Sequence, residues 1–309
     1  MDIIAGVDEA GRGPLAGPVV AAAVILPEIH GIEGLRDSKK LSPKQREILF
    51  GKIKNKASSI GIGQSSVKRI DEINIRNATF MAMERALSYL TIKPNSALID
   101  GETLPDQTIP NTGIIGGDDK VDSIKAASIV AKVYRDNLMI KYSKIFPEYG
   151  LDKHKGYGTT RHMEALKEYK ATPIHRRSFR PVRDNFPTLT WLDHKNRVGW
   201  LGEKIAALYL MDRDIIIEGL NQYFPPYGEI DIIGIKKGIW IFAEVKSHLN
   251  GVVRSNSQLK QFDVGKIKVS AKNYLKGYDG FHNFQIDYIK VSFGKNGPIV
   301  QHYRDVQFE

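Results

Sequence analysis

The chain has 309 residues, which is long for one compact domain and comfortable for two. Its content of 42% apolar and 26% charged residues is typical of a folded globular protein and gives no sign of disorder. The absence of cysteine excludes disulfides, thiolate catalysis and Cys-ligated zinc. No apolar run approaches the roughly 20 residues that span a bilayer, and the first residues lack a secretory signal, so we expect a cytoplasmic protein without membrane association.

The formal net charge is +10, with a pI near 9.4. Between Leu151 and Arg183 the chain carries nine basic residues against three acidic ones. Such an excess suits a polyanionic partner, because each Lys or Arg at a phosphate releases condensed counterions. A solubilising surface would have the same composition, so charge alone leaves nucleic acid and no partner both open.

The first half of the chain alternates strand and helix patterns. Apolar runs at 3–9 and 18–26, separated by a glycine-rich segment, predict a hairpin-like pair of strands. Ser42 followed by proline predicts the start of a helix. Residues 96–99 predict a short buried strand, and 123–140 predict a further helix. The pattern indicates an α/β sheet flanked by helices.

The second half begins a new pattern. The periodicity lapses around 186–189, and a helix with an apolar stripe begins near Arg197. The segments that follow predict strands at 215–217, 229–233, 239–246 and 286–293, with a helix over 264–276. We therefore expect a first domain at 1–187, a linker at 188–196 and a second, smaller α/β domain at 197–309.

Four acidic residues of the first domain stand where strands or helices place functional groups. Asp8 and Glu9 end the first apolar strand, Asp100 ends the strand at 96–99, and Asp136 lies within the predicted helix that follows. Facing carboxylates repel one another, and a hard divalent cation such as Mg²⁺ or Mn²⁺ relieves that repulsion. Two such ions can activate water and stabilise a leaving oxygen in phosphodiester hydrolysis.

Each of these acids also has a structural interpretation. Asp100, which precedes a glycine, is also typical of a turn residue, and Asp136 is also typical of a solvated helix position. Regular strand alternation points Glu9 away from Asp8 unless the backbone bends after it. Spacing alone leaves these alternatives open.

Six motifs, in order over about residues 1–182, carry a family resemblance. They are Val7-Asp8-Glu9-Ala10-Gly11-Arg12-Gly13, Asp37-Ser38-Lys39-Lys40-Leu41, Asp100-Gly101, the run from Ala126 to Asp136, His154-Lys155-Gly156-Tyr157-Gly158-Thr159 and His175-Arg176-Arg177-Ser178-Phe179. This set closely resembles ribonuclease HII, the type 2 ribonuclease H family. The resemblance implies an RNase H-like fold, a mixed five-stranded sheet with flanking helices.

The resemblance also implies an activity and its residues. The four metal-binding carboxylates of the family map onto Asp8, Glu9, Asp100 and Asp136, with Mg²⁺ or Mn²⁺ as cofactor. The implied reaction cleaves RNA/DNA hybrids, and duplex DNA 5′ to an embedded ribonucleotide, leaving a 3′-hydroxyl and a 5′-phosphate. It implies a role in DNA repair and RNA primer removal.

Substrate contacts follow from the same resemblance. In the family a Gly-Arg-Gly loop reads the ribose 2′-hydroxyl with a tyrosine stacked nearby, and here these are Gly11, Arg12, Gly13 and Tyr157. Discrimination of RNA from DNA at one position must use that hydroxyl, and glycine lets backbone groups approach a sugar closely. An ordinary turn and a core tyrosine are the structural alternatives. Three lysines are expected phosphate contacts, although surface lysines are common: Lys39, Lys40 and Lys155.

The second domain carries its own group of charged residues, Glu203, Asp231, Glu244 and Lys246. In a strand Glu244 and Lys246 point to one face, and Asp231 belongs to a neighbouring predicted strand. The group resembles the PD-(D/E)xK (restriction-endonuclease-like) nuclease fold, and over about 197–293 the chain resembles the small YraN-like family. An exposed Glu203 and a surface ion pair of Glu244 with Lys246 are the structural alternatives.

Three functions follow for the whole chain. The leading interpretation is a ribonuclease H-type enzyme with a fused nuclease-like domain, which is either a second nuclease or a module that binds nucleic acid. A second is a DNA endonuclease that the first domain only targets. The third is a nucleic-acid-binding scaffold whose carboxylates hold no metal. The partner expected in every case is nucleic acid, and the sequence indicates no particular protein partner.

Overall fold

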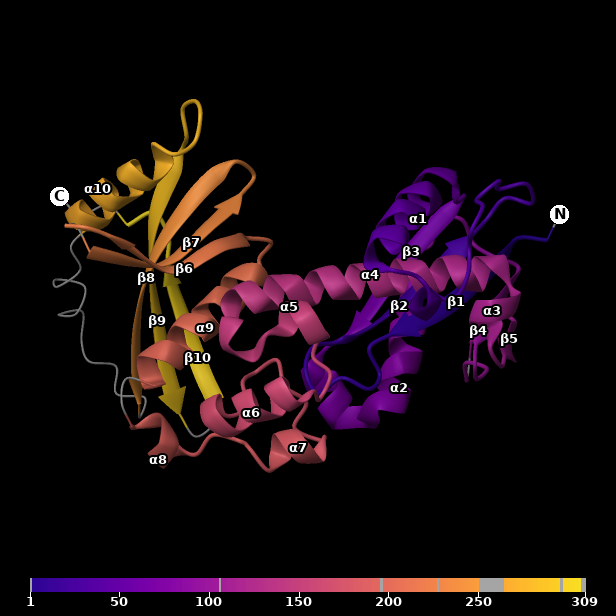
Figure 1. Cartoon of the computed structure of the whole chain (residues 1–309), viewed down its shortest axis with the longest axis horizontal. Coiled ribbons are helices and arrows are strands. Elements are labelled where there is room, and N and C mark those ends of the chain that lie inside the picture. The colour runs from indigo at the N-terminus through magenta and orange to yellow at the C-terminus, as the bar shows by residue number, and fades with distance from the viewer. Residues whose placement is uncertain are drawn as a thin grey trace. The chain divides into compact units, whose positions relative to one another are not determined.

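The structure is a computed structural model that describes residues 2–105, 107–194, 197–226, 228–249, 264–294 and 297–306. The chain forms two compact units (Figure 1), which are described separately. The first unit comprises Met1–Ile140 and Tyr149–Phe186, and the second comprises Lys141–Glu148 and Pro187–Glu309. No helix within the described residues is both long and apolar enough to cross a bilayer.

The first unit is built on a five-stranded mixed sheet in the order β3-β2-β1-β4-β5. Its strands are β1 (Ile4–Ala10), β2 (Val19–Ile25), β3 (Ser59–Ser65), β4 (Ser96–Asp100) and β5 (Asn111–Ile114). The first three strands are antiparallel neighbours, as the predicted strand pair requires, and β4 and β5 run parallel to β1. The predicted mixed sheet is confirmed, and β3 and β5 are additions to the strands expected from the sequence.

Helices cover both faces of this sheet. On one face α1 (Pro43–Lys56) and α4 (Asp122–Ile145) pack over the apolar side chains of β2, and on the other α2 (Val67–Ser88) packs over β1, β2 and β4. Every residue of β2 is buried, which explains its run of small and β-branched side chains. The helix predicted to begin at Ser42 does so, because the Ser42 hydroxyl accepts from the backbone N–H of Gln45.

The approach of α4 to the sheet depends on one glycine. A Cβ atom built on Gly6 of β1 would lie 2.2 Å from the carbonyl carbon of Ser123 and 2.4 Å from the nitrogen of Ile124, at the start of α4. Only glycine therefore lets this helix begin directly over β1.

Short elements complete the chain between the larger ones. They are η1 (Ser38–Lys40), α3 (Gly117–Lys120), η2 (Pro147–Tyr149), α5 (Leu151–His154), α6 (Thr160–Tyr169), α7 (Arg180–Arg183) and α8 (Leu189–Leu192). The segment expected as a linker, 188–196, thus contains one helical turn, and its residues Lys195 and Asn196 lie outside the described residues.

The second unit contains its own five-stranded sheet in the order β10-β9-β8-β7-β6. In chain order its elements are α9 (Arg197–Met211), β6 (Ile216–Phe224), β7 (Gly228–Lys236), β8 (Ile239–Leu249), α10 (Val264–Leu275), β9 (Phe284–Gly294) and β10 (Gly297–Tyr303). Strands β8 and β9 are parallel, and the other pairs are antiparallel. Helix α10 packs on an apolar cluster of the sheet, so the predicted smaller α/β unit is confirmed.

Candidate active site

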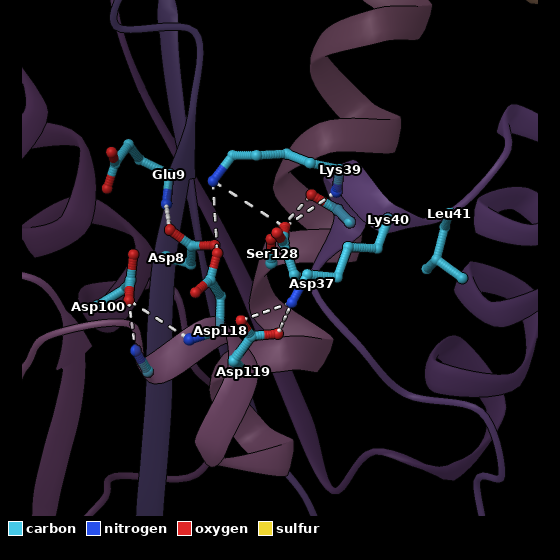
Figure 2. Close-up of polar contacts among 12 residues, drawn as sticks. Asp8, Glu9, Asp37, Lys39, Lys40, Leu41, Asp100, Asp118, Asp119 and Ser128 are labelled. Carbon is cyan, nitrogen blue, oxygen red and sulfur yellow. Dashed lines mark hydrogen bonds and ion pairs between the residues drawn. The ribbon is translucent and has the colours of Figure 1, made fainter.

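Three carboxylates converge at one edge of the first sheet. One carboxylate oxygen each of Asp8, Asp100 and Asp118 lies within 4.8 Å of the other two. Asp8 and Asp100 are neighbours because β1 and β4 are parallel and Val7 pairs with Ile99, the residue before each acid. Figure 2 shows the three side chains pointing toward one another.

Asp118 reaches the cluster through a short turn after β5. The backbone N–H groups of Gly117 and Asp118 donate to Oδ1 of Asp100, at 2.7 and 3.4 Å. A side chain at Gly117 would meet this same oxygen at 3.4 Å and the end of the Ile124 side chain at 2.6 Å. Asp100 thus fixes the backbone of the turn that carries Asp118.

The acids of this cluster are held near one another at an electrostatic cost. Burial, then the charges of Glu9 and Asp100, raise the pKa of Asp8 well above its ordinary value. Burial, then Asp100 and Asp37, also raise the pKa of Asp118. A hard divalent cation compensates such repulsion, and carboxylate oxygens are its preferred ligands. The donor set therefore fits Mg²⁺ or Mn²⁺.

Glu9 lies beside this cluster rather than in it. Its carboxylate is 3.7 Å from the guanidinium of Arg12, and its backbone N–H donates to Oδ1 of Asp8 at 2.6 Å. Burial raises the pKa of Glu9, the charge of Arg12 lowers it, and the charge of Asp100 raises it further. The Glu9 carboxylate is therefore close enough to the cluster to be repelled by Asp100. Figure 2 shows its side chain diverging from that of Asp8, as strand alternation predicts.

The structure does not bring Asp136 into this cluster, in contrast to the grouping of four acids expected from the sequence. The Asp136 carboxylate pairs with Nζ of Lys132 at 2.8 Å and lies 3.8 Å from Arg46. It lines a separate cavity of about 330 Å³ together with these cations, Lys155 and Tyr157. The charge of Asp136 is therefore compensated by the side chains of Lys132 and Arg46.

Sequence reasoning missed Asp118, although a signal was present. Gly116-Gly117-Asp118-Asp119 comes one residue after the end of a short strand, β5, that runs parallel to β4. Functional groups of such sheets gather beyond the carboxyl ends of parallel strands. The helix of Asp136 was easier to recognise from the sequence than the four-residue strand β5.

Lysines from the segment 37–41 border the acidic cluster. Nζ of Lys39 lies 3.4 Å from Asp118 and 4.0 Å from Asp37, while the Lys39 side chain stays 77% exposed. Lys40 pairs with Asp119 at 2.6 Å (Figure 2). The third predicted phosphate contact, Lys155, donates to the backbone oxygen of Asp152. Lys39 is therefore the cation at the mouth of the cluster.

The Gly-Arg-Gly loop follows β1 and meets Tyr157. Gly11 has a φ of +98°, and a Cβ atom there would lie 1.9 Å from Nε of Arg135, so only glycine fits. A Cβ atom on Gly13 would lie 3.5 Å from the ring of Tyr157, which is 47% exposed. The structure thus places an accessible aromatic ring against the loop, and this tyrosine is not a core residue.

A chain of two buried histidines fixes the backbone of Tyr157. The N–H of Thr172 points at Nδ1 of His175 (3.1 Å), so Nε2 of His175 carries the proton and donates to Nε2 of His162 (3.1 Å). His162 then donates from Nδ1 to the carbonyl of Tyr157 at 2.9 Å. Burial lowers the pKa of His162 to about 4 and that of His175 well below its ordinary value, so both rings are neutral.

The second unit brings together most of its predicted group. Ile232 of β7 pairs with Ala243 of β8, so Asp231 and Glu244 are cross-strand neighbours. Asp231 accepts from the backbone N–H of Val245 at 2.7 Å, and Lys246 pairs with Glu244. Burial, then Glu244, raise the pKa of Asp231 to about 7.

Glu203 of α9 lies at the border of this group and is half-buried, not exposed. Its carboxylate accepts from the side chain of Asn221 at 2.9 Å, and burial raises its pKa. Within the described residues of this unit, no three acids come as close as those of the first sheet. The structure therefore shows a pair, Asp231 and Glu244, with Lys246 beside it and Glu203 nearby.

Two known protein families match separate parts of the chain. A family described as "Ribonuclease HII" matches residues 5–182, and "Uncharacterised protein family UPF0102" matches residues 202–291. The chain is 54% identical over 180 residues to the ribonuclease HII of Shewanella pealeana, covering 58% of this chain and 89% of that protein. It is 52% identical over 182 residues to that of Polaromonas sp., covering 59% and 92%.

A solved structure resembles the first unit. The ribonuclease H2 of Pyrococcus horikoshii is 31% identical, with a TM-score of 0.52, and the match covers 59% of this chain and 95% of that one. The mixed sheet with its flanking helices is thus an RNase H-like fold.

Proposed function

The chain belongs to the ribonuclease HII family and is an endoribonuclease, and from this premise we propose a substrate and a site. The substrates are RNA/DNA hybrids and duplex DNA that contains single ribonucleotides, cut on the 5′ side of the ribonucleotide to give a 3′-hydroxyl and a 5′-phosphate. Such an activity serves DNA repair and RNA primer removal. The single observation that carries the proposed site is the convergence of Asp8, Asp100 and Asp118.

These three carboxylates, with Glu9 beside them, would hold the divalent metal ions that the family uses. Bound Mg²⁺ or Mn²⁺ supplies activation of water and stabilisation of the leaving oxygen in phosphodiester hydrolysis. The chain contributes a preformed set of oxygens, because Asp100 fixes the backbone of Gly117 and Asp118 before any ligand arrives. The proposed site leaves out Asp136, since Lys132 and Arg46 compensate its charge.

The neighbouring loop supports recognition of the ribose. Gly11, Arg12 and Gly13 follow Asp8 and Glu9 after a single residue, Ala10, so a sugar held by the loop lies close to the acids. The exposed ring of Tyr157 offers a surface for stacking against that sugar or its base. Lys39, exposed beside Asp118, suits a phosphate contact, with Lys40 and Lys155 as further candidates once they leave their present partners.

The test is cleavage of three matched duplexes by the full-length protein: one with a single ribonucleotide, one with a continuous RNA strand and one of DNA alone. We expect cutting of the first two only, with product ends mapped as 3′-hydroxyl and 5′-phosphate. The Asp100→Asn variant, which removes one ligand without adding bulk, should be inactive on both. Equal cutting of the all-DNA duplex would overturn the proposed substrate.

A second candidate function concerns the second unit, for which we propose the bounds 197–309 after a linker at 188–196. The specific observation is the half-buried cross-strand pair of Asp231 and Glu244 with Lys246 beside it. Burial, and then the charge of Glu244, raise the pKa of Asp231. Metal binding would relieve that repulsion, and Lys246 on the same strand face would orient water. The unit would then be a second metal-dependent nuclease, with Glu203 at its border. The alternatives are a module that only binds nucleic acid and a chain whose main activity is that of a DNA endonuclease.

Full-length protein carrying Asp100→Asn separates these functions, because its first site is silent. Metal-dependent cleavage of branched or flapped DNA by this variant, lost on adding Asp231→Ala, would establish the second nuclease. Binding of the same DNA without cleavage would indicate a binding module. The enzyme is proposed to act in the cytoplasm, which its nucleic-acid substrates and the absence of cysteine support.

A further inference from the structure

Two arginines lie fully buried beneath the Gly-Arg-Gly loop. Arg135 of α4 and Arg176, in the segment between α6 and α7, have exposed fractions of 1% and 0%. A buried guanidinium is costly unless every part of it is compensated, and buried cations ordinarily pair with carboxylates. Arg176 has no acidic side chain within ion-pair distance in the part of the chain that the structure describes.

Arg176 instead donates to three backbone carbonyls of one loop. Its Nη2 lies 2.6 Å from the oxygen of Gly11, its Nη1 lies 2.7 Å from that of Arg12, and its Nε lies 3.0 Å from that of Gly17. Burial, then the charge of Arg135, lower the pKa of Arg176 to about 9, so the guanidinium remains charged at neutral pH. The three hydrogen bonds of the Arg176 guanidinium therefore hold the backbone of residues 11–17.

The direction of these carbonyls determines the direction of the neighbouring amides. In a trans peptide the C=O and N–H of one unit point in opposite directions. With the Gly11 and Arg12 oxygens drawn toward Arg176, the N–H groups of Arg12 and Gly13 point away from it. Neither N–H donates to an acceptor among the described residues. The loop thus presents two adjacent free donors on its outer side.

Arg135 extends the same support to the segment of Tyr157. It donates to the oxygens of Ala16 and Pro18 and to that of Lys155, each at 3.0 Å. The N–H of Leu15 donates to the oxygen of Gly156 at 2.8 Å, and the N–H of Arg176 donates to Leu15. These hydrogen bonds therefore connect the Gly-Arg-Gly loop to the segment 155–157, which carries Tyr157.

We propose that Arg176 is a positioning residue for ribonucleotide selectivity, which it sets by aiming the Arg12 and Gly13 amides at the sugar. This inference rests on the proposed function, since it presumes that the loop faces the ribose. A hydroxyl oxygen can accept from two converging N–H groups, whereas deoxyribose offers no acceptor at that carbon. The proposal depends on the planar geometry of the Arg176 guanidinium, which holds three carbonyls at once, and a positive charge alone would not suffice.

The variant Arg176→Lys separates geometry from charge, because lysine keeps the cation but cannot hold three carbonyls in one plane. The measurement is affinity, with Ca²⁺ in place of Mg²⁺, for a duplex with one ribonucleotide and for the same duplex of DNA alone. We expect the preference of the wild type for the ribonucleotide to fall by on the order of tenfold, the effect of losing a charge-assisted hydrogen bond. Arg177→Lys, at the exposed neighbouring position, is the matched control and should keep the preference.

Three outcomes are informative. A preference unchanged in Arg176→Lys, with only a lower melting temperature, would overturn the proposal and leave Arg176 a structural residue. Absence of any preference in the wild type would instead contradict the proposed function. Should Arg176→Lys fail to fold, NMR of the wild type decides: the amide signals of Arg12 and Gly13 should shift with the ribonucleotide duplex and not with the all-DNA duplex. Equal shifts with both would refute the inference.

Discussion

Replacing Asp8 with asparagine should stabilise the metal-free protein while abolishing cleavage. Asp8 is 4% exposed, and burial together with the charges of Glu9 and Asp100 raises its pKa well above the ordinary value of 3.8. At a pH between the unfolded and the folded pKa, the folded state therefore holds a proton on this carboxyl that the unfolded chain releases. An amide of the same shape keeps the acceptor for the Glu9 N–H and removes the charge.

The sign and size of the effect follow from proton linkage. Between the unfolded and the folded pKa of Asp8, the native wild type binds more protons than the unfolded chain, so its stability falls as pH rises. Each pH unit of that interval is worth about 1.4 kcal/mol. For a domain of this size such an increment corresponds to roughly 3 to 5 °C in melting temperature. The advantage of Asp8→Asn should be absent at acid pH, grow through the interval and level off above the folded pKa.

The assay is thermal unfolding of both proteins in a chelator from about pH 4 to pH 8, repeated with saturating Mg²⁺. Added metal should stabilise the wild type and not the variant, because ligand binding to the native state adds to stability. The control is Asp119→Asn, whose exposed carboxylate pairs with Lys40 and should give no gain. A stability difference that does not change with pH would refute the reasoning, since it would show that Asp8 titrates alike in both states.

Three further predictions test neighbouring parts of the account. Tyr157→Ala should reduce cleavage at an isolated ribonucleotide more than on a continuous hybrid, because one 2′-hydroxyl offers few other contacts; equal losses would make the residue structural. Gly6→Ala should destabilise the protein by about 1–3 kcal/mol or more in chemical denaturation, because its Cβ would meet the α4 backbone at 2.2 Å, whereas Gly51→Ala in open space should not. The metal affinity of the second unit is measured by calorimetry in the Asp100→Asn variant. As pH rises toward the Asp231 pKa of about 7, this affinity should increase by up to about tenfold per pH unit and then level off, because the carboxyl must lose its proton to bind a metal ion. A metal affinity that does not change with pH would exclude Asp231 as a ligand.

Strong local patterns predicted most of the fold. The strands around Asp8 and Asp100 and the helix that begins after Ser42 all formed as expected, because each has an apolar run or a cap that acts locally. Strand β5 escaped prediction, since its four residues Asn111–Ile114 are only partly buried and derive their conformation from pairing with β4. Strand β10 escaped for a similar reason, because β9 supplies its pairing.

Site residues could likewise be predicted only where a local sequence pattern places them. Asp8 and Asp100 end apolar strands that pair, so their meeting follows from the sheet. Asp118 and Asp136 both follow in chain order, and only the tertiary structure shows that Asp118 turns back to Asp100 while Asp136 pairs with Lys132. The role of Arg176 was likewise invisible in sequence, because its three acceptors lie about 160 residues earlier in the chain.

The assignment of the metal site is tested most directly by comparing Asp118→Asn with Asp136→Asn. Both are single-atom changes in the same unit, and both are assayed on a duplex with one ribonucleotide at saturating Mg²⁺. We predict that Asp118→Asn abolishes cleavage and weakens metal binding, because it removes one of three converging ligands, while Asp136→Asn retains both. Loss of cleavage and metal binding in Asp136→Asn, with near-normal turnover in Asp118→Asn, would contradict the site described by this structure.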